Sequence, residues 1–261
     1  MQTPIPTVLI TGASTGIGAT YADRFARRGH NLVLVARDKG RLDALATRLR
    51  SEARVEVDVV QADLTVTADL ERVEARLRTD DRIGILINNA GAATESTFAN
   101  PDVEAFDRLI RLNVTSLTRL SAAVIPRFLD RGAGAIINLA SVVGLAPEIG
   151  LGPYGATKAY VLALSQSMQN ELGPKGLYVQ AVLPAATRTE IWERSGRDVN
   201  ALKGVMDVSE MVDAALVGFD RREPVTIPSL PEVSQWAAFE AARKAMLPNF
   251  INSHAAARYR K

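Results

Sequence analysis

Short apolar runs alternate with amphipathic segments along almost the whole chain. Runs rich in β-branched residues predict buried strands over residues 7–11, 31–36, 55–60, 83–87, 135–140, 177–183 and 225–227. Between them, apolar residues recur every three or four positions, which predicts helices over residues 19–28, 41–50, 68–79, 102–130, 154–172, 208–220 and 231–246. Strands that alternate with helices predict an α/β protein with a doubly wound parallel sheet in three αβα layers.

A glycine-rich turn joins the first predicted strand to the first predicted helix. Its candidate ligand contacts are Gly12, Ser14, Thr15, Gly16, Ile17 and Gly18. A strand, a glycine-rich turn and a helix together bring a helix N-terminus up to a phosphate, and glycines let the backbone approach a pyrophosphate closely. Ser14 and Thr15 add hydroxyl donors. We therefore expect a single-domain, Rossmann-like protein, spanning residues 1–261, that binds a dinucleotide.

Arg37, at the end of the second strand, bears on the choice of dinucleotide. An acidic residue there would bond the 2′-hydroxyl of NAD, whereas an arginine suits the 2′-phosphate of NADP. We expect NADP(H), with NAD(H) less favoured; an ordinary exposed arginine is the alternative interpretation. Asp63 and Leu64 follow the third strand. Asp63 either accepts a hydrogen bond from the adenine amino group or caps the next helix.

Tyr154 and Lys158 are the candidate catalytic pair. They are four positions apart in a predicted helix, so the phenol and the ammonium share one face. A nearby cation lowers the pKa of a phenol from about 10, which would make it a usable acid or base. Ser141 follows a buried strand, where parallel α/β folds place their chemistry. Considered alone, Tyr154 and Lys158 would be interpreted as a surface pair.

Composition narrows the class of protein. The 261 residues are 47% hydrophobic and 23% charged, as in globular proteins, and bases interspersed with acids give a net charge of +2. Nucleic-acid binding is therefore not expected. No cysteine and only two histidines leave no basis for a metal site. Residues 1–6 lack a signal-peptide pattern and no apolar run approaches about 20 residues, so we expect a cytoplasmic protein without membrane contact.

Four motifs in this order resemble those of the short-chain dehydrogenase/reductase family, over nearly the whole chain. They are the TGxxxGxG turn at residues 11–18, the NNAG sequence at residues 88–91, a helix asparagine at Asn113, and Ser141 with Tyr154-x-x-x-Lys158. The resemblance implies that Tyr154 is the general acid in reduction and that Ser141 polarises the carbonyl oxygen. It implies that Lys158 holds the nicotinamide ribose and lowers the pKa of Tyr154. Asn113 would anchor a water that relays protons to Lys158; a helix–helix hydrogen bond is its alternative role.

The resemblance also implies further cofactor contacts and one departure from the family pattern. The implied contacts are Asn89, Ala90, Gly91, Tyr154, Lys158, Pro184, Thr187 and Thr189. The family usually has a glycine after the proline, and here Ala185 stands in its place. If that position needs a positive φ, alanine costs about 1 kcal/mol or more; otherwise the loop follows a different path and reshapes the pocket. Thr15 replaces a basic residue of some NADP-dependent members, which leaves Arg37 as the main 2′-phosphate ligand.

The expected activity is hydride transfer between a nicotinamide and a carbonyl or secondary alcohol. The flanking residues are mostly apolar: Val142, Val143, Leu145, Pro147, Ile149, Leu151, Ile191 and Trp192. We therefore expect an apolar ketone, aldehyde or secondary alcohol, with residues 185–207 as a substrate-binding loop region; plain core packing is the alternative for each flanking residue.

Two other activities and an assembly also come from the resemblance. An NAD-dependent dehydrogenase and a non-catalytic NADP(H)-binding regulator remain alternatives, whereas epimerases or dehydratases of the extended relatives need a larger substrate domain. Family members commonly pair through the helices that carry the asparagine and the tyrosine, so a homodimer or homotetramer is expected.

Overall fold

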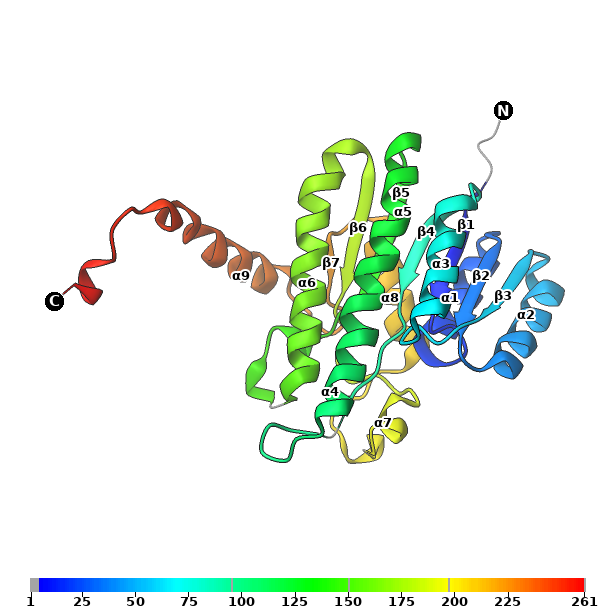
Figure 1. Ribbon diagram of the computed structural model, residues 1–261, viewed down its shortest axis with the longest axis horizontal. Helices are drawn as coiled ribbons and strands as arrows, with labels where there is room; N and C mark the ends of the chain where they lie inside the picture. The colour runs from blue at the N-terminus through cyan, green and yellow to red at the C-terminus, as the bar shows by residue number, and fades with distance from the viewer. Residues whose placement is uncertain (1–4, 95, 150, 197, 261) are drawn as a thin grey trace. The chain divides into compact units, whose positions relative to one another are not determined.

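The computed structural model describes residues 5–94, 96–149, 151–196 and 198–260. Its strands form one seven-stranded sheet in which all neighbours are parallel, in the order β3-β2-β1-β4-β5-β6-β7 (Figure 1). The strands are β1 (Thr7–Thr11), β2 (Leu32–Ala36), β3 (Val57–Gln61), β4 (Ile83–Asn88), β5 (Gly134–Leu139), β6 (Leu177–Val182) and β7 (Val225–Thr226). The strand order reverses between β1 and β4, and ligands of such sheets bind beside the carboxyl ends of the strands at this point.

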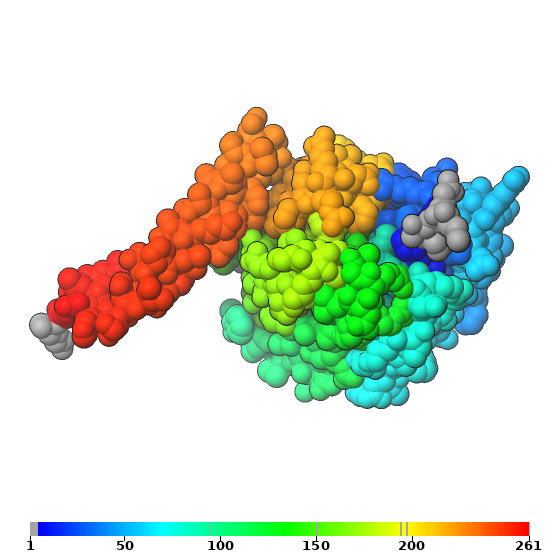
Figure 2. All heavy atoms as spheres, turned by 90° about the horizontal axis from the view of Figure 1, so that it is seen from above, coloured from blue at the N-terminus to red at the C-terminus, as the bar shows by residue number. Residues whose placement is uncertain are grey.

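Helices cover both faces of the sheet. They are α1 (Gly16–Arg27), α2 (Lys39–Ala53), α3 (Thr67–Thr79), α4 (Val103–Ile110), α5 (Leu117–Arg131), α6 (Gly152–Leu172), the short α7 (Ile191–Arg194) and α8 (Val208–Asp220). One core cluster packs α1, α2 and α8 against the sheet, and the other packs α3, α5 and α6 against the opposite face. Figure 2, seen from above relative to Figure 1, shows α3, α5 and α6 on one side and α8 on the other. The predicted three-layer, doubly wound fold is confirmed.

The strands are mostly apolar because both faces of the sheet are covered. Every residue of β1, β2, β4 and β6 is buried, whereas β3 at the edge of the sheet is only partly so. This is the reason for continuous apolar runs in place of an alternating pattern. Each large apolar side chain that is fully buried in these clusters stabilises the fold by roughly 1.5–3 kcal/mol.

The long helix predicted over residues 102–130 is divided by a π-helical turn. α4 ends at Ile110, the π-helical turn covers Arg111–Ser116, and α5 follows directly. α5 contains Pro126 and continues past it to Arg131, and its C-cap residue, Gly132, has φ = 65°. π-Helical turns inside helices occur frequently at functional sites, and this one contains Asn113.

Residues Ser229–Lys261 form a second compact unit, separate from Met1–Pro228. It contains α9 (Val233–Ala245), which confirms the helix predicted over residues 231–246, and the 3₁₀ turns Leu247–Ile251 and Ala257–Tyr259. No residue of α9 is buried. None of the helices in the described part of the chain is both long and apolar enough to span a bilayer. One domain over residues 1–261 stays a prediction.

Candidate active site

The glycine-rich turn packs against the end of β4. Gly12 has φ = 65°, and a Cβ at this position would lie 2.8 Å from Asn89 Nδ2 and 2.9 Å from the Ala90 backbone. The hydroxyl oxygen of Thr11 accepts hydrogen bonds from the N–H groups of Asn89 and Ala90, both at 3.0 Å. Asn89 Nδ2 in turn donates to the backbone carbonyls of Thr11 and Gly12. These contacts hold the glycine-rich turn against the NNAG segment at the end of β4.

The N-terminus of α1 suits a phosphate group. Its N-cap residue, Thr15, makes no side-chain capping bond, and the first turn contains no acidic residue. Gly16, Ile17 and Gly18 are the first three helical residues, whose N–H groups have no partner within the helix. With the positive end of the helix dipole, these donors fit the pyrophosphate of a dinucleotide. Ser14 lies half-buried in the same turn.

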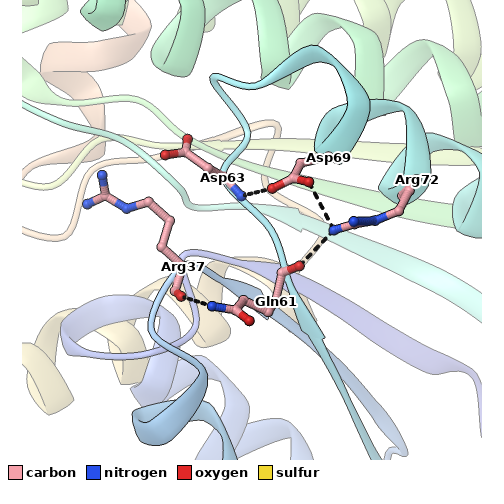
Figure 3. Close-up of a pocket in the computed structure, with 5 residues that line it drawn as sticks. All are labelled: Arg37, Gln61, Asp63, Asp69 and Arg72. Atoms are coloured by element: carbon pink, nitrogen blue, oxygen red, sulfur yellow. Dashed lines mark hydrogen bonds and ion pairs between the residues drawn. The ribbon is translucent and has the colours of Figure 1, made fainter.

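Arg37 borders a cavity of about 310 Å³ beyond the ends of β2 and β3. Its other lining residues are Gln61, Asp63, Asp69 and Arg72 (Figure 3). Arg72 donates to the carbonyl of Gln61 and pairs with Asp69, and Gln61 Nε2 donates to the carbonyl of Arg37. Figure 3 shows the Arg37 guanidinium extending away from this network, and no described side chain pairs with it. A free guanidinium here fits a 2′-phosphate.

Asp63 shapes the turn that precedes α3. Its Oδ1 accepts from the N–H and the hydroxyl of Thr65, at 2.9 and 2.7 Å, while Val66 is the N-cap residue of α3. The capping alternative is therefore wrong, since Asp63 holds the turn without capping the helix. The adenine contact stays a prediction. Leu64 is buried in the core cluster beside the turn.

Tyr154 and Lys158 lie on the same face of α6, as their spacing predicts. Lys158 Nζ is 5.7 Å from the centroid of the Tyr154 ring. Lys158 is buried, and its Nζ donates a 2.7 Å hydrogen bond to the carbonyl of Leu139 at the end of β5. This bond places the ammonium at the carboxyl edge of the sheet.

Burial sets the pKa values of this pair. Removal from water lowers the pKa of Lys158 to about 8, because it disfavours the charged ammonium. Removal from water also raises the pKa of the half-buried Tyr154 to about 12, while a hydrogen bond with Ser141 acts in the opposite direction. The expectation that the pKa of Tyr154 lies below its ordinary value therefore differs from this structure, in which desolvation outweighs the hydrogen bond with Ser141.

Ser141 connects the ends of β5 and β6 to the tyrosine. Its side chain is buried, and its Oγ donates to the carbonyl of Pro184 at 3.1 Å. The N–H of Val142 donates to the same carbonyl. Together with the hydrogen bond between Ser141 and Tyr154, these contacts place two hydroxyl groups side by side at the edge of the sheet.

Asn113 is buried and fully engaged. Its Oδ1 accepts from the N–H of Ala92, and its Nδ2 donates to the carbonyl of Ala92 and to Thr157 Oγ1. The bond to Thr157 is the helix–helix contact expected as its alternative role. A Cβ on Gly91 would lie 3.3 Å from Asn113 Oδ1 and 3.6 Å from Lys158 Nζ. Both groups thus border one small space, while the water relay stays a prediction.

The loop after β6 reaches back to the glycine-rich turn. Ala185 does not adopt a positive φ, so the strain considered for this position is absent. Thr187 is buried and its carbonyl accepts a 2.7 Å bond from Trp192 Nε1. A Cβ on Gly16 would lie 3.1 Å from Thr189 Cγ2. Thr189 therefore lies at the start of α1 and Pro184 lies beside Ser141. The cofactor contacts of Pro184, Thr187 and Thr189 stay predictions, and residue 197 of the predicted loop region lies outside the described residues.

The flanking apolar residues are not core residues. Val142, Val143, Leu145, Leu151 and both Ile191 and Trp192 are half-buried, and Pro147 and Ile149 are exposed. None belongs to either core cluster. This placement favours the lining of a binding site over plain core packing.

Sequence reasoning missed three groups of contacts. Thr11 holds the two motifs together, and Thr157 joins Asn113 to the carbonyl of Tyr154. Thr11 is the first residue of the TGxxxGxG motif and Thr157 directly precedes Lys158, which is the signal that could have identified these contacts. The ion pair between Arg41 and Glu190 joins positions 149 residues apart and has no sequence signal. In the described part of the chain, no three or more His, Asp and Glu side chains gather where they could hold a metal ion.

Comparisons with known proteins agree with this geometry. A short-chain dehydrogenase from Sphingobium yanoikuyae, solved in complex with NADPH, is 64% identical, with a TM-score of 0.97 over 98% of this chain and 100% of that chain. A bulky-bulky ketone specific alcohol dehydrogenase from Comamonas testosteroni is 57% identical, with a TM-score of 0.92 over 99% of this chain and 100% of that one.

A curated relative is more distant. Very-long-chain 3-oxoacyl-CoA reductase-B from Danio rerio is 35% identical over 187 residues, which are 70% of this chain but only 60% of that protein. Residues 6–200 also match the pattern of the family described as short chain dehydrogenase. Together with the grouped motif residues, this match shows that the chain belongs to the short-chain dehydrogenase family and is an oxidoreductase.

Proposed function

We propose that this protein is an NADP(H)-dependent oxidoreductase that interconverts apolar ketones or aldehydes and the corresponding secondary or primary alcohols. The observation that carries the proposal is the grouping of Ser141, Tyr154 and Lys158 at the carboxyl edge of the sheet, beside the glycine-rich turn. The guanidinium of Arg37, which pairs with no side chain in the described residues, and the NADPH bound to the relative from Sphingobium yanoikuyae support NADP(H).

Two ends of the site would hold the cofactor. The N–H groups at the start of α1 would bind its pyrophosphate, and Arg37 its 2′-phosphate. Lys158 and Thr189 would hold the nicotinamide end. When bound, the cofactor supplies or accepts a hydride, and the protein supplies orientation and electrostatics.

The protein's own groups manage the proton. With a pKa of about 12, Tyr154 is protonated at neutral pH and is therefore ready to donate to the carbonyl oxygen in the reductive direction. Ser141 hydrogen-bonds the same oxygen and polarises the carbonyl. Lys158, with a pKa of about 8, is cationic at neutral pH and stabilises the phenolate that proton donation leaves. The space between Asn113 and Lys158 is the proposed place for the water that returns the proton.

The proposed substrate is an apolar ketone with sizeable groups on the carbonyl carbon. The half-buried apolar residues after Ser141 and the indole of Trp192 offer apolar surface with few charges. The name of the relative from Comamonas testosteroni supports bulky ketones in particular. An acyl-CoA substrate is less well supported, because the matching segment spans only 60% of the reductase from Danio rerio.

We also propose a homodimer or homotetramer. Val103 and Ile110 of α4 and Tyr160 of α6 are 69%, 46% and 38% exposed, which leaves apolar surface on the helices that flank the site. Light scattering would show two or four chains per particle; a monomer at micromolar concentration would contradict this proposal. The cytoplasmic location stays a prediction.

A ketone panel tests the proposed activity. The purified protein would be given NADPH or NADH and a series that runs from a small dialkyl ketone to an aryl alkyl and a diaryl ketone. We expect NADPH consumption, with kcat/KM rising as the groups become larger and more apolar. Binding of NADPH without turnover of any carbonyl or alcohol would contradict the proposal and favour a regulator.

A further inference from the structure

Two neighbouring residues of the loop after β6 reach two different helix N-termini. Thr189 lies against Gly16, the first residue of α1. Glu190 accepts hydrogen bonds from Arg41, in the first turn of α2, at both carboxylate oxygens, with distances of 2.8 and 2.7 Å. Loop residues 189–190 therefore bridge the starts of α1 and α2.

Arg41 is firmly placed on its own helix. Its N–H donates to Asp38, the N-cap residue of α2, and its Nε lies 3.3 Å from the second carboxylate oxygen of Asp38. α2 itself is anchored by the buried side chains Leu42, Ala46 and Leu49. The loop is thus the partner that moves when the pair between Arg41 and Glu190 breaks.

Hydrogen bonds within the loop link Glu190 to the predicted substrate-binding residue Trp192. The N–H of Arg188 donates to the carbonyl of Met206, and the N–H of Met206 donates to the carbonyl of Ala186. Trp192 Nε1 donates to the carbonyl of Thr187. These hydrogen bonds restrain residues 186–192 as a unit. The position of Glu190 therefore affects the position of the Trp192 side chain.

The bridge crosses the path that a dinucleotide must take. If the pyrophosphate lies at the start of α1 and the 2′-phosphate at Arg37, the cofactor passes under residues 189–190 to enter or leave. We propose that the ion pair between Arg41 and Glu190 is a latch that holds this loop over the cofactor and slows its release. This inference rests on the proposed dinucleotide function, and Glu190 is a positioning residue within it.

An exposed ion pair adds little to stability, which makes the latch testable by substitution. The side chains of Arg41 and Glu190 are 47% and 37% exposed. Glu190→Gln and Arg41→Gln should therefore fold normally, with unchanged melting temperatures. The test is the rate at which each holoprotein releases NADPH or NADH, followed by stopped-flow displacement with excess unlabelled competitor.

We expect both single variants to release either cofactor roughly three- to tenfold faster than the wild type. The charge-exchanged variant Arg41→Glu/Glu190→Arg should recover much of the slow release. The control is Asp213→Asn, which removes a similar two-bond pair with Arg24 between α1 and α8 and should leave release unchanged. The KM for the ketone should rise in the Glu190 variant more than kcat falls.

Three results would overturn the latch. One is unchanged release in both single variants, and another is an equal acceleration by Asp213→Asn. The third is slower NADPH release in Glu190→Gln together with unchanged NADH release, because it would make Arg41 a phosphate ligand for which Glu190 merely competes. Release is measured without turnover, so an inactive wild type that still binds cofactor would contradict the proposed activity alone; a wild type that binds neither cofactor would overturn both.

Discussion

Lys158 is buried, although its proposed role requires a positive charge. It is buried, with a hydrogen bond to Leu139 as its one hydrogen bond in the described part of the chain, and burial lowers its pKa to about 8. Its proposed role nevertheless needs the cation, because the phenolate of Tyr154 needs a positive neighbour. The protein therefore accepts a cost in stability to keep an ammonium beside the phenol.

The pH dependence of reduction should report this ammonium. Below about pH 8 Lys158 is charged, and above it the charge that stabilises the phenolate is lost. We expect kcat/KM for ketone reduction to be level at neutral pH and to fall as the pH rises through about 8. In Lys158→Arg, whose side chain stays charged, any remaining activity should lack this fall. The same fall in both proteins would assign it to another group.

The stability of Lys158→Met should exceed that of the wild type at neutral pH. The pKa of Lys158 is near 10.5 when unfolded and about 8 when folded, so the unfolded state binds more protons between these values. The wild type consequently gains stability as the pH rises from 8 to 10.5, and it carries the full penalty below 8. After allowance for the lost hydrogen bond to Leu139, the free energy of unfolding of the variant at pH 7 should be about 1–3 kcal/mol higher than that of the wild type. Chemical denaturation at pH 7 and 10 measures the difference, which should shrink at the higher pH.

For individual residues, the sequence predicted which side chains lie close together but not their pKa values. The spacing of four placed Tyr154 and Lys158 on one helix face, because helical geometry is local. The pKa of Tyr154 depends on how much of the ring the surrounding loops remove from water, which a local pattern does not contain. The hydrogen-bond partners of Asn113 were not predicted for the same reason, because Ala92 and Thr157 belong to other parts of the chain.

The glycine-rich turn shows how one element depends on another. Its glycines were predicted from their place between a strand and a helix, and Gly12 proves to be needed for a positive φ and for close contact with the end of β4. Periodicity also predicted the seven strands and the longer helices to within a few residues, but not the short α7. It missed the π-helical turn Arg111–Ser116, which covers only six residues within an otherwise continuous helical segment.

A comparison of alanine substitutions at Gly12 and Gly132 separates the cost of backbone strain from the cost of steric contact with neighbouring atoms. Gly132 has the same φ of 65°, but a Cβ there meets nothing within 4 Å. Gly132→Ala should therefore cost only the backbone strain of about 1–2 kcal/mol. Gly12→Ala should lower the free energy of unfolding further and weaken the binding of both NADPH and NADH. Equal effects of the two variants on stability and on cofactor binding would contradict the packing described for this turn.

Arg37→Ala tests the end of β2 as the determinant of cofactor choice. Loss of a charge-assisted contact with the 2′-phosphate should weaken NADPH binding by about ten- to a hundredfold and leave NADH binding nearly unchanged. The charge-matched control is Lys175→Ala, just before β6 and therefore at the amino end of the strands. Calorimetric titration of both cofactors gives the affinities. An equal loss for NADPH and NADH would assign Arg37 a structural role.

At the scale of the whole molecule, the sheet order creates the site. β1 and β4 are neighbours although two strands separate them in the sequence, so the glycine-rich turn and the NNAG segment meet. β5 and β6 bring Ser141 and Pro184 together in the same way. The alternation of elements predicted this sheet, whereas the path of residues 185–207 depends on contacts with Gly16 and Arg41 that lie far away in the sequence.

The most direct test of the account is to replace Tyr154 with phenylalanine and measure turnover and NADPH affinity in the same preparation. Removing the phenol hydroxyl removes the proton donor, so kcat for ketone reduction should fall by roughly 10²–10⁴-fold. The affinity for NADPH should stay within about twofold, because the glycine-rich turn, Arg37 and Lys158 remain. Turnover equal to that of the wild type would remove Tyr154 from the chemistry and contradict the proposed mechanism.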